Sequence, residues 1–224
     1  MMNYDGINMI TCGSENCYVI RGKDGDILID TGSTRYREEI GVWLDNYNIR
    51  LIFLTHGHND HIGNAAYFAK RFDADIAMSA YDTALARDNK IHKLYRTGAR
   101  GFVIMAASKM TFLSRSESFE TNIFLEDGLP VGDICGIDDC VAVRLDGHTK
   151  GSFGVLHGKD LYLGDAAMNF VAPSFPAICE SPKAARESLD LIRELKPERV
   201  FFGHGSPVMG DSHAYEKMFN KTIF

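Results

Sequence analysis

The sequence predicts a mixed α/β protein, on three observations. Short apolar runs bounded by glycine or charged residues, typical of β-strands, recur along the chain. Segments whose apolar residues repeat at helical spacing alternate with these runs twice. No proline- or serine-rich linker separates the two halves. We therefore expect one domain over residues 1–224, with room for a helical insert around residues 80–125.

The first half of the chain combines strands that open the fold with helices of apolar periodicity. The run at 51–54 is apolar throughout, which predicts a strand buried on both faces. The expected elements are, in order, strands over 17–20 and 27–29, a helix over 36–47, a strand over 51–54, a helix over 62–72, a strand over 76–78 and a helix from about residue 80.

The second half begins with the least regular stretch, 95–136, where we expect a helical insert followed by a hairpin. Glycines punctuate the apolar runs that follow it. These runs predict strands over 141–145, 153–157 and 161–163, a helix over 183–195 and a buried strand over 199–202.

The composition, 45% hydrophobic and 24% charged, is that of an ordinary soluble globular protein. No apolar run approaches the ~20 residues of a membrane-spanning helix, and the first residues lack a secretory pattern, so we expect a cytoplasmic protein without a membrane partner. A net charge of −6 without basic runs argues against nucleic acid and favours a small-molecule substrate. The five cysteines are expected to be reduced thiols, and nothing indicates an oligomeric state.

The strongest signal for function is the run His56-Gly57-His58-Asn59-Asp60-His61, directly after the predicted buried strand. In an extended segment residues two apart point the same way, so His56 and His58 can chelate one ion. Asp60 and His61 face a neighbouring position and can hold a second ion. Imidazole and carboxylate ligands together suit zinc, with iron or manganese as alternatives. The structural alternative for Asp60 is a helix N-cap.

Three later residues, His148, Asp165 and His204, each end a predicted strand beside a glycine. Glycine there lets the backbone turn and leaves space near a ligand. With the first cluster they complete the ligand count of a two-metal centre. The other histidines, His92, His157 and His213, have no partner pattern and are expected to be surface or core residues.

These residues resemble the signature of the metallo-β-lactamase superfamily, H-x-H-x-D-H, over 56–61, and the likeness extends over residues 16–208. The resemblance implies a four-layer αββα sandwich with two metal ions where the sheets meet. It assigns one ion to His56, His58 and His148, the other to Asp60, His61 and His204, and a bridging role to Asp165. Asp30 is expected to orient a metal-bound histidine, with Thr55 and Thr149 as hydrogen-bonding neighbours.

The resemblance also implies a hydrolase, in which a hydroxide bridging the two ions attacks an ester, thioester, lactone or phosphodiester-like substrate. Asp60 would also accept or pass a proton. The joint presence of His148 and Asp165 favours glyoxalase II-like and related members over true β-lactamases. The short segment after His204 argues against a glutathione thioester. Segments 95–136 and 166–181 are expected to line the pocket.

Two alternatives remain within the same fold. One is a non-heme iron redox or oxygen-dependent enzyme of the flavodiiron or sulfur dioxygenase type. Flavodiiron proteins carry an acid where this chain has His58 and append a flavin domain, and a sulfur dioxygenase uses only part of the ligand set. The other is a non-catalytic scaffold, which would generally have lost ligands, whereas here all seven positions are filled.

Overall fold

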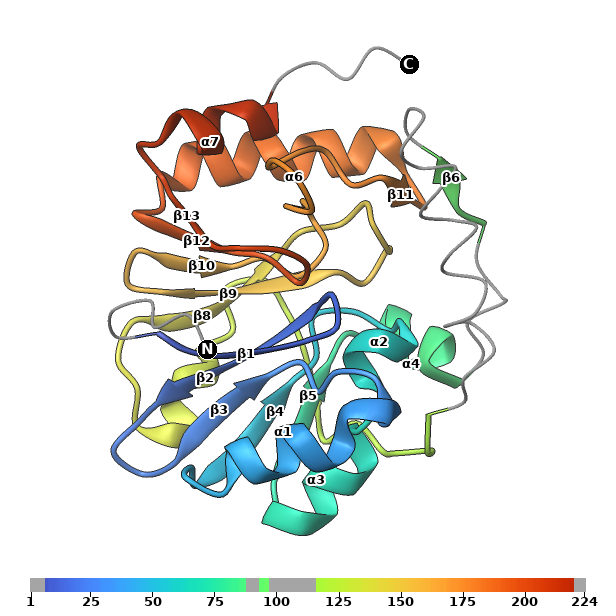
Figure 1. The fold of residues 1–224 in the computed structure, drawn as a ribbon, viewed down its shortest axis with the longest axis vertical. Coiled ribbons are helices and arrows are strands. Elements are labelled where there is room, and N and C mark those ends of the chain that lie inside the picture. Colours follow the sequence, from blue (N-terminus) through green and yellow to red (C-terminus); the bar gives the residue numbers. More distant parts are fainter. Residues whose placement is uncertain (1–6, 88–92, 97–115, 220–224) are drawn as a thin grey trace.

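The computed structural model describes residues 7–87, 93–96 and 116–219, and it has four layers (Figure 1). Two β-sheets face each other in the middle, and helices cover the outer face of each sheet. The predicted αββα sandwich is therefore confirmed. Each sheet has two apolar faces to bury, so one face packs against the other sheet and the opposite face packs against helices.

The first sheet has the strand order β1-β2-β3-β4-β5-β7, and helices α1 (Arg37–Leu44) and α3 (Ala65–Phe72) pack on it. Its first three strands pair antiparallel and the remaining ones pair parallel. The strands are β1 (Asn8–Cys12), β2 (Glu15–Arg21), β3 (Asp26–Ile29), β4 (Ile49–Phe53), β5 (Asp75–Met78) and β7 (Ile123–Phe124).

The second sheet has the order β13-β12-β10-β9-β8, antiparallel except for the parallel pair β10–β12. Helices α6 (Pro182–Leu195) and α7 (His213–Glu216) cover it. Its strands are β8 (Cys140–Arg144), β9 (Phe153–His157), β10 (Asp160–Tyr162), β12 (Arg199–Phe201) and β13 (Val208–Met209). A two-stranded ribbon, β6 (Tyr95–Arg96) with β11 (Ile178–Cys179), lies beside the sandwich.

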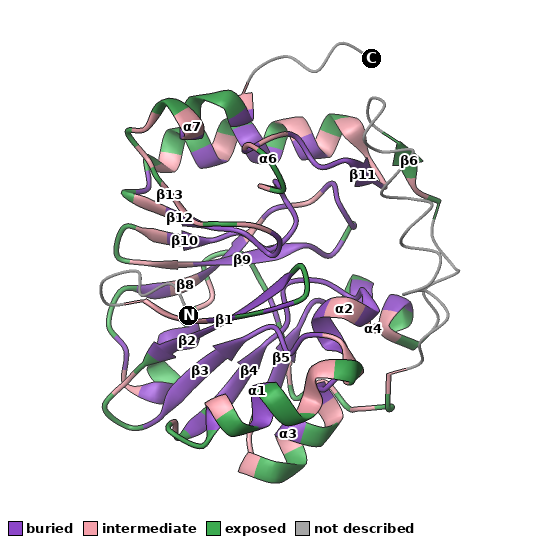
Figure 2. Cartoon of the chain, viewed as in Figure 1, coloured by how far each residue is buried: buried purple, intermediate pink, exposed green. Residues whose placement is uncertain are grey.

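Three apolar clusters hold the layers together. Phe53, Phe153 and Phe201 belong to the cluster between the sheets and are fully buried. The other two clusters join each sheet to its helices, which are buried toward the sheet and exposed toward solvent (Figure 2). Because β4 and β12 are covered on both faces, they are rigid supports for the loops that leave their carboxyl ends.

Most expected elements appear within one or two residues of their predicted bounds, but three expectations were wrong. The fold opens with β1, a strand that precedes the first two expected ones. The expected helix over 62–72 is two helices, α2 (Asn59–Ile62) and α3, interrupted at Gly63 and Asn64. The amide nitrogen of Asn64 donates to the carbonyls of residues 31 to 33, which fixes this break.

The expected hairpin near the end of 95–136 is also wrong for the part that the structure describes. β7 pairs with β5 in parallel, and a 3-10 helix (Val131–Cys135) follows it. Helix α4 (Ala80–Arg87) occupies the start of the expected insert, and the rest of the insert lies largely outside the described residues.

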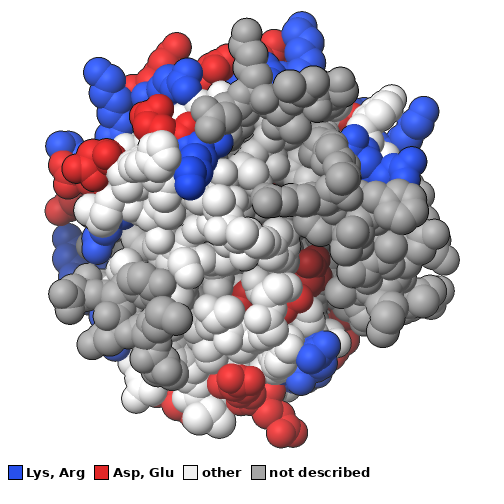
Figure 3. Space-filling view, turned by 45° about the horizontal axis from the view of Figure 1, so that its top comes forward, with Lys and Arg blue, Asp and Glu red and all other residues white. Residues whose placement is uncertain are grey.

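The surface carries interspersed charges. On the face shown in Figure 3, basic and acidic side chains are scattered around the rim and the centre is largely uncharged. In the described part of the chain, no helix is both long enough and apolar enough to cross a bilayer.

Candidate metal centre

The seven side chains that the sequence singled out converge where loops from the two sheets meet. Four of them, at positions 56 to 61, follow β4 of the first sheet, and the other three come from loops of the second sheet. All are buried except Asp60, whose side chain is 20% exposed. The structure therefore joins residues from distant parts of the chain in one cluster.

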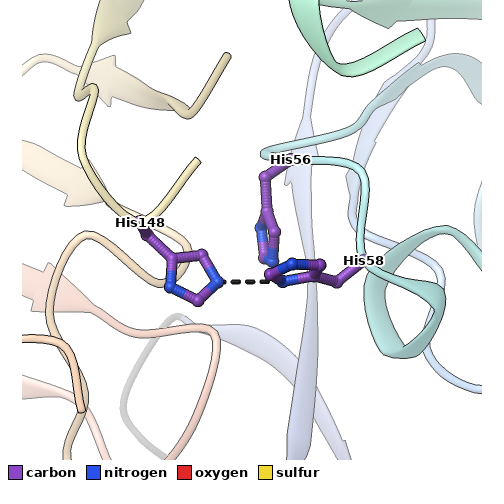
Figure 4. A group of neighbouring side chains, drawn as sticks. All are labelled: His56, His58 and His148. Atoms are coloured by element: carbon purple, nitrogen blue, oxygen red, sulfur yellow. Dashed lines mark hydrogen bonds between the residues drawn. The ribbon is translucent and has the colours of Figure 1, made fainter. Parts of the chain in front are cut away.

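One group consists of His56, His58 and His148, whose nitrogen atoms lie within 4.8 Å of one another. Figure 4 shows His148 pointing from its own loop toward the other two rings. Nε2 of His148 lies 2.9 Å from Nδ1 of His58. Three converging nitrogens at these separations can hold one metal ion.

The second group consists of Asp60, His61 and His204, again with their ligand atoms within 4.8 Å. Asp165 connects the two groups: its carboxylate lies 3.7 Å from His61, 3.4 Å from His204 and 3.5 Å from His148. The N-cap alternative for Asp60 is wrong, because the N-cap of α2 is His58 and Asp60 lies inside the helix.

Hydrogen bonds at Nδ1 fix the orientation of three of the rings. Nδ1 of His148 lies 2.8 Å from the carbonyl of Ile178, and Nδ1 of His204 lies 3.0 Å from the carbonyl of Ser14. A nitrogen that donates to a carbonyl carries the proton, so Nε2 of each ring is left as the basic atom. These two Nε2 atoms face the cluster.

Asp30 orients the third ring, as the sequence indicated. Its Oδ2 lies 2.8 Å from Nδ1 of His61 and accepts from the hydroxyl of Thr55, while Oδ1 accepts the backbone N–H of Thr55. Asp30 has a left-handed backbone, with φ of 57°, which turns the chain at the end of β3. One buried carboxylate thereby links β3, β4 and α2.

Asp82 of α4 is a buried residue that the sequence analysis missed. Its Oδ2 accepts the backbone N–H of Gly57 at 2.8 Å and the hydroxyl of Thr149 at 2.7 Å. It therefore ties the loop of His56 and His58 to the loop of His148. Nothing in the local sequence distinguishes Asp82 from a surface helix residue, because both partners are distant along the chain.

Close approach between the loops requires a glycine at position 203. A Cβ atom there would lie 2.4 Å from Oδ1 of Asp165 and 2.8 Å from a ring carbon of His61. Gly164 has a positive φ of 55°, which sets the turn before Asp165. Both positions were expected to need glycine.

The donor set fits a metal pair, because buried atoms within it lack protein partners. Nε2 of His56 and Oδ1 of Asp165 are buried without a hydrogen bond. Nε2 of His61 and Nε2 of His204 lie only 3.4 Å apart, although both rings use Nδ1 for other contacts. Burying such atoms unpaired is costly, and cations between them would remove the cost.

Burial and the neighbouring carboxylates shift the pKa values of His61 and His204. Burial lowers the pKa of His61, but the carboxylates of Asp30, Asp165 and Asp60 outweigh it and raise that pKa to about 10. Burial likewise lowers the pKa of His204, and Asp165 raises it to about 9.

The pKa values of Asp165 and His56 are shifted downward instead. Burial raises the pKa of Asp165, but the histidines around it hold that pKa well below its usual range. Burial and the neighbouring histidines lower the pKa of His56 well below its usual range. His56 is therefore a neutral ring, as a metal ligand must be.

In segment 166–181, which was expected to line the pocket, the ring of Phe170 stacks on His204 at a centroid distance of 5.1 Å. Phe175 instead belongs to the core beneath α6. Lys150 and His213 are exposed, His157 is half-buried in β9, and neither histidine belongs to a group of possible metal ligands among the described residues. His92 and most of segment 95–136 lie outside the described residues, and all five cysteines are free and buried.

Comparison with known proteins gives one family. A model of the metallo-beta-lactamase superfamily matches residues 10–204. The probable metallo-hydrolase YflN of Bacillus subtilis (strain 168) is 21% identical over 229 residues, which cover 92% of this chain and 86% of that protein.

Solved structures show the same fold. A metallo-beta-lactamase family protein from Thermus thermophilus is similar with a TM-score of 0.71 and 19% identity, over 95% of this chain and 77% of that one. TTHA1623, solved in a di-iron-bound form, is similar with a TM-score of 0.66 and 22% identity. The similarity covers 92% of this chain and 95% of that one.

Proposed function

Since the chain belongs to the metallo-β-lactamase superfamily, we propose that it is a dinuclear metal-dependent hydrolase of small molecules. The observation that carries the proposal is the pair of ligand groups joined by Asp165, with a buried, unpaired atom on His56 and on Asp165. The proposed ligands are His56, His58 and His148 for one ion, Asp60, His61 and His204 for the other, and Asp165 for both.

A bound pair of divalent ions would supply a hydroxide nucleophile near neutral pH and would polarise the oxygen that gains charge. The protein's own residues position the ligands. Carbonyls and Asp30 hold the Nδ1 atoms of His148, His204 and His61, so that Nε2 of each ring faces inward. Asp60, the most exposed of the set, is the residue that can exchange a proton with substrate or solvent.

We propose an ester, thioester, lactone or phosphodiester as the substrate class. The stacked ring of Phe170, which is 46% exposed beside His204, supports a substrate with an apolar group. A net charge of −6 supports a small molecule over nucleic acid. We further propose a single cytoplasmic domain without a membrane partner, with zinc as the first candidate metal.

The test is the metal content of protein purified without added metal, measured by elemental analysis. We expect about two zinc, iron or manganese ions per chain, and fewer in His58→Ala and in Asp165→Ala. His157→Ala, a histidine away from the cluster, is the control and should keep the full content. One ion or none, unchanged by Asp165→Ala, would rule out the dinuclear centre.

A second candidate is a non-heme iron redox or oxygen-dependent enzyme on the same site. It is favoured by the di-iron form in which the similar TTHA1623 was solved, and histidine and carboxylate ligands suit iron as well as zinc. Iron in the purified protein, together with oxygen consumption that the zinc-loaded protein lacks, would support this candidate over a hydrolase.

A further inference from the structure

The loop that carries His204 is held by the hairpin of β1 and β2. Ser14, in the turn of this hairpin, presents its carbonyl to Nδ1 of His204 at 3.0 Å. The backbone N–H of Asn16, the second residue of β2, donates to the carbonyl of Gly203 at 2.9 Å. Glu15 lies between these two residues and forms a β-bridge with His204. Segments 190 positions apart in the chain are therefore fixed side by side at one proposed ligand.

The side chain of Asn16 bonds to the backbone on both sides of His204. Its Nδ2 donates to the carbonyl of Phe202 at 3.0 Å and to the carbonyl of Gly205 at 2.7 Å, so both protons of the amide are used. Gly205 has a positive φ of 92°, a conformation that glycine adopts readily, so the chain can turn here and present its carbonyl to the amide. A single buried residue, 1% exposed, thus closes the turn that carries His204.

The contacts of Asn16 also fix the orientation of its amide. Thr11, opposite it on β1, donates its hydroxyl to Oδ1 at 2.7 Å. The two carbonyls on the other side accept hydrogen bonds and therefore require Nδ2. A carboxylate oxygen in place of Nδ2 would face these two carbonyl oxygens and leave them without their donor, which is costly inside a protein. The contacts therefore select asparagine over the isosteric aspartate.

We propose that Asn16 is a positioning residue of the metal centre, which holds His204 in the place required for the second ion. The inference rests on the proposed dinuclear centre. His204 shares this ion with Asp60 and His61, and ligand atoms of the three lie within 4.8 Å of one another. The side-chain hydrogen bonds of Asn16 lead to the loop of His204 and to Thr11. Because none leads to the other ligand group, only the second ion depends on Asn16.

The test is metal binding by the full chain after its metal has been removed with a chelator. Titration of Zn²⁺ in competition with a chromophoric chelator gives the two stepwise affinities. Asn16→Asp keeps the shape of the side chain and Asn16→Ala adds no charge, and both lose the two N–H donors. Thr11→Val, at an exposed position, removes only the hydroxyl that orients the amide and is the milder change.

Tyr18→Phe is the matched control. The hydroxyl of Tyr18 donates to the same carbonyl of Phe202, at 2.7 Å, so its removal costs a buried hydrogen bond on the same strand but leaves the bond from Asn16 to Gly205 in place. We expect both Asn16 variants to weaken one of the two Zn²⁺ sites about 10- to 100-fold. Thr11→Val should weaken the same site less, and Tyr18→Phe should keep both affinities.

A second experiment asks whether Asn16 acts through His204. His58→Ala disables the other ligand group, so adding Asn16→Ala should weaken the ion that remains. His204→Ala removes the ring that Asn16 positions, so adding Asn16→Ala should leave the remaining ion unchanged. Equal losses in the two backgrounds, wild-type affinities in both Asn16 variants, or the same loss in Tyr18→Phe would show that the inference is wrong. A wild type that binds fewer than two ions would instead overturn the dinuclear centre itself, so the two failures are distinguishable.

Discussion

Oδ2 of Asp30 lies 2.8 Å from Nδ1 of His61, inside the core and out of reach of solvent. The same carboxylate receives two hydrogen bonds from Thr55, the residue that precedes His56. The side chain that fixes the tautomer of one proposed ligand therefore also holds the backbone that carries another. Binding geometry and folding stability are coupled at this residue.

Asp30→Asn should weaken metal binding and destabilise the fold together. The amide cannot accept from His61 and from Thr55 in the same arrangement, so a buried donor is left unpaired. We expect a loss of about 1–3 kcal/mol in the free energy of unfolding and of about 10- to 100-fold in metal affinity. Urea unfolding and chelator competition measure the two effects. Asp75→Asn, at an exposed strand end, is the control, and a variant indistinguishable from it would contradict the coupling.

Asp82→Asn should affect mainly the group of His56, His58 and His148. Asp82 joins the backbone of Gly57 to the hydroxyl of Thr149, and an amide cannot reproduce both charge-assisted bonds. We expect one of the two ions to bind about tenfold more weakly or worse, while the second group keeps its affinity. Titration of the metal-free variant tests this, with the exposed Asp138→Asn as control. Equal loss at both sites would show that Asp82 acts on the fold as a whole.

The metal-free chain should lose stability as the pH rises above neutrality. The pKa of His61 is about 10 and that of His204 about 9, both above the ordinary histidine value of 6.5. A raised pKa means that the protonated rings stabilise the fold fully below pH 6.5, and that this contribution is lost as the pH passes about 9 and about 10. Denaturant unfolding in excess chelator across this range measures it.

The depressed pKa of Asp165 has the opposite sign: its contribution is present above its ordinary value of 3.8 and is lost as the pH falls. With metal bound, the ions take the place of the histidine protons, so the loss at high pH should shrink and binding should release protons. Stability of the metal-free chain that increases from pH 6.5 to 10 would contradict the assignment.

Phe170→Ala should change substrate selectivity without changing metal content. The ring lies against His204 but offers no ligand atom, and it is 46% exposed. We expect a higher KM for substrates with an apolar group and little change for small polar ones. Kinetics on a matched pair of esters measures this, with the exposed Val171→Ala as control. An equal effect on both esters would mean that Phe170 does not contact the substrate.

Much of the fold could be predicted from sequence because its central strands are continuous apolar runs. The strand that precedes His56 was visible for this reason, and the helix over 183–195 was visible from the helical spacing of its apolar residues. The break at Gly63 and Asn64 was not, since it depends on hydrogen bonds from Asn64 to a loop some 30 residues away. β1 was missed because it mixes buried and exposed residues without regular alternation.

In the candidate site too, residues with a local sequence pattern could be predicted and residues that depend on distant contacts could not. His56, His58, Asp60 and His61 are adjacent in sequence, so their spacing alone indicates chemistry. Asp82 could not be recognised, because an isolated acidic residue carries no local sign of its partners. The role of the seven residues as metal ligands stays a prediction.

Each proposed ligand group takes members from both halves of the chain: the first spans residues 56 to 148, and the second spans 60 to 204. A chain emerging from the ribosome therefore offers no complete two-ion centre until residue 204 has been made and the second sheet has docked on the first. Contacts this distant in sequence form late, after their loops have closed. Uptake of the second ion is consequently a reporter of finished folding, and its slow capture by refolding protein would show when the two sheets dock.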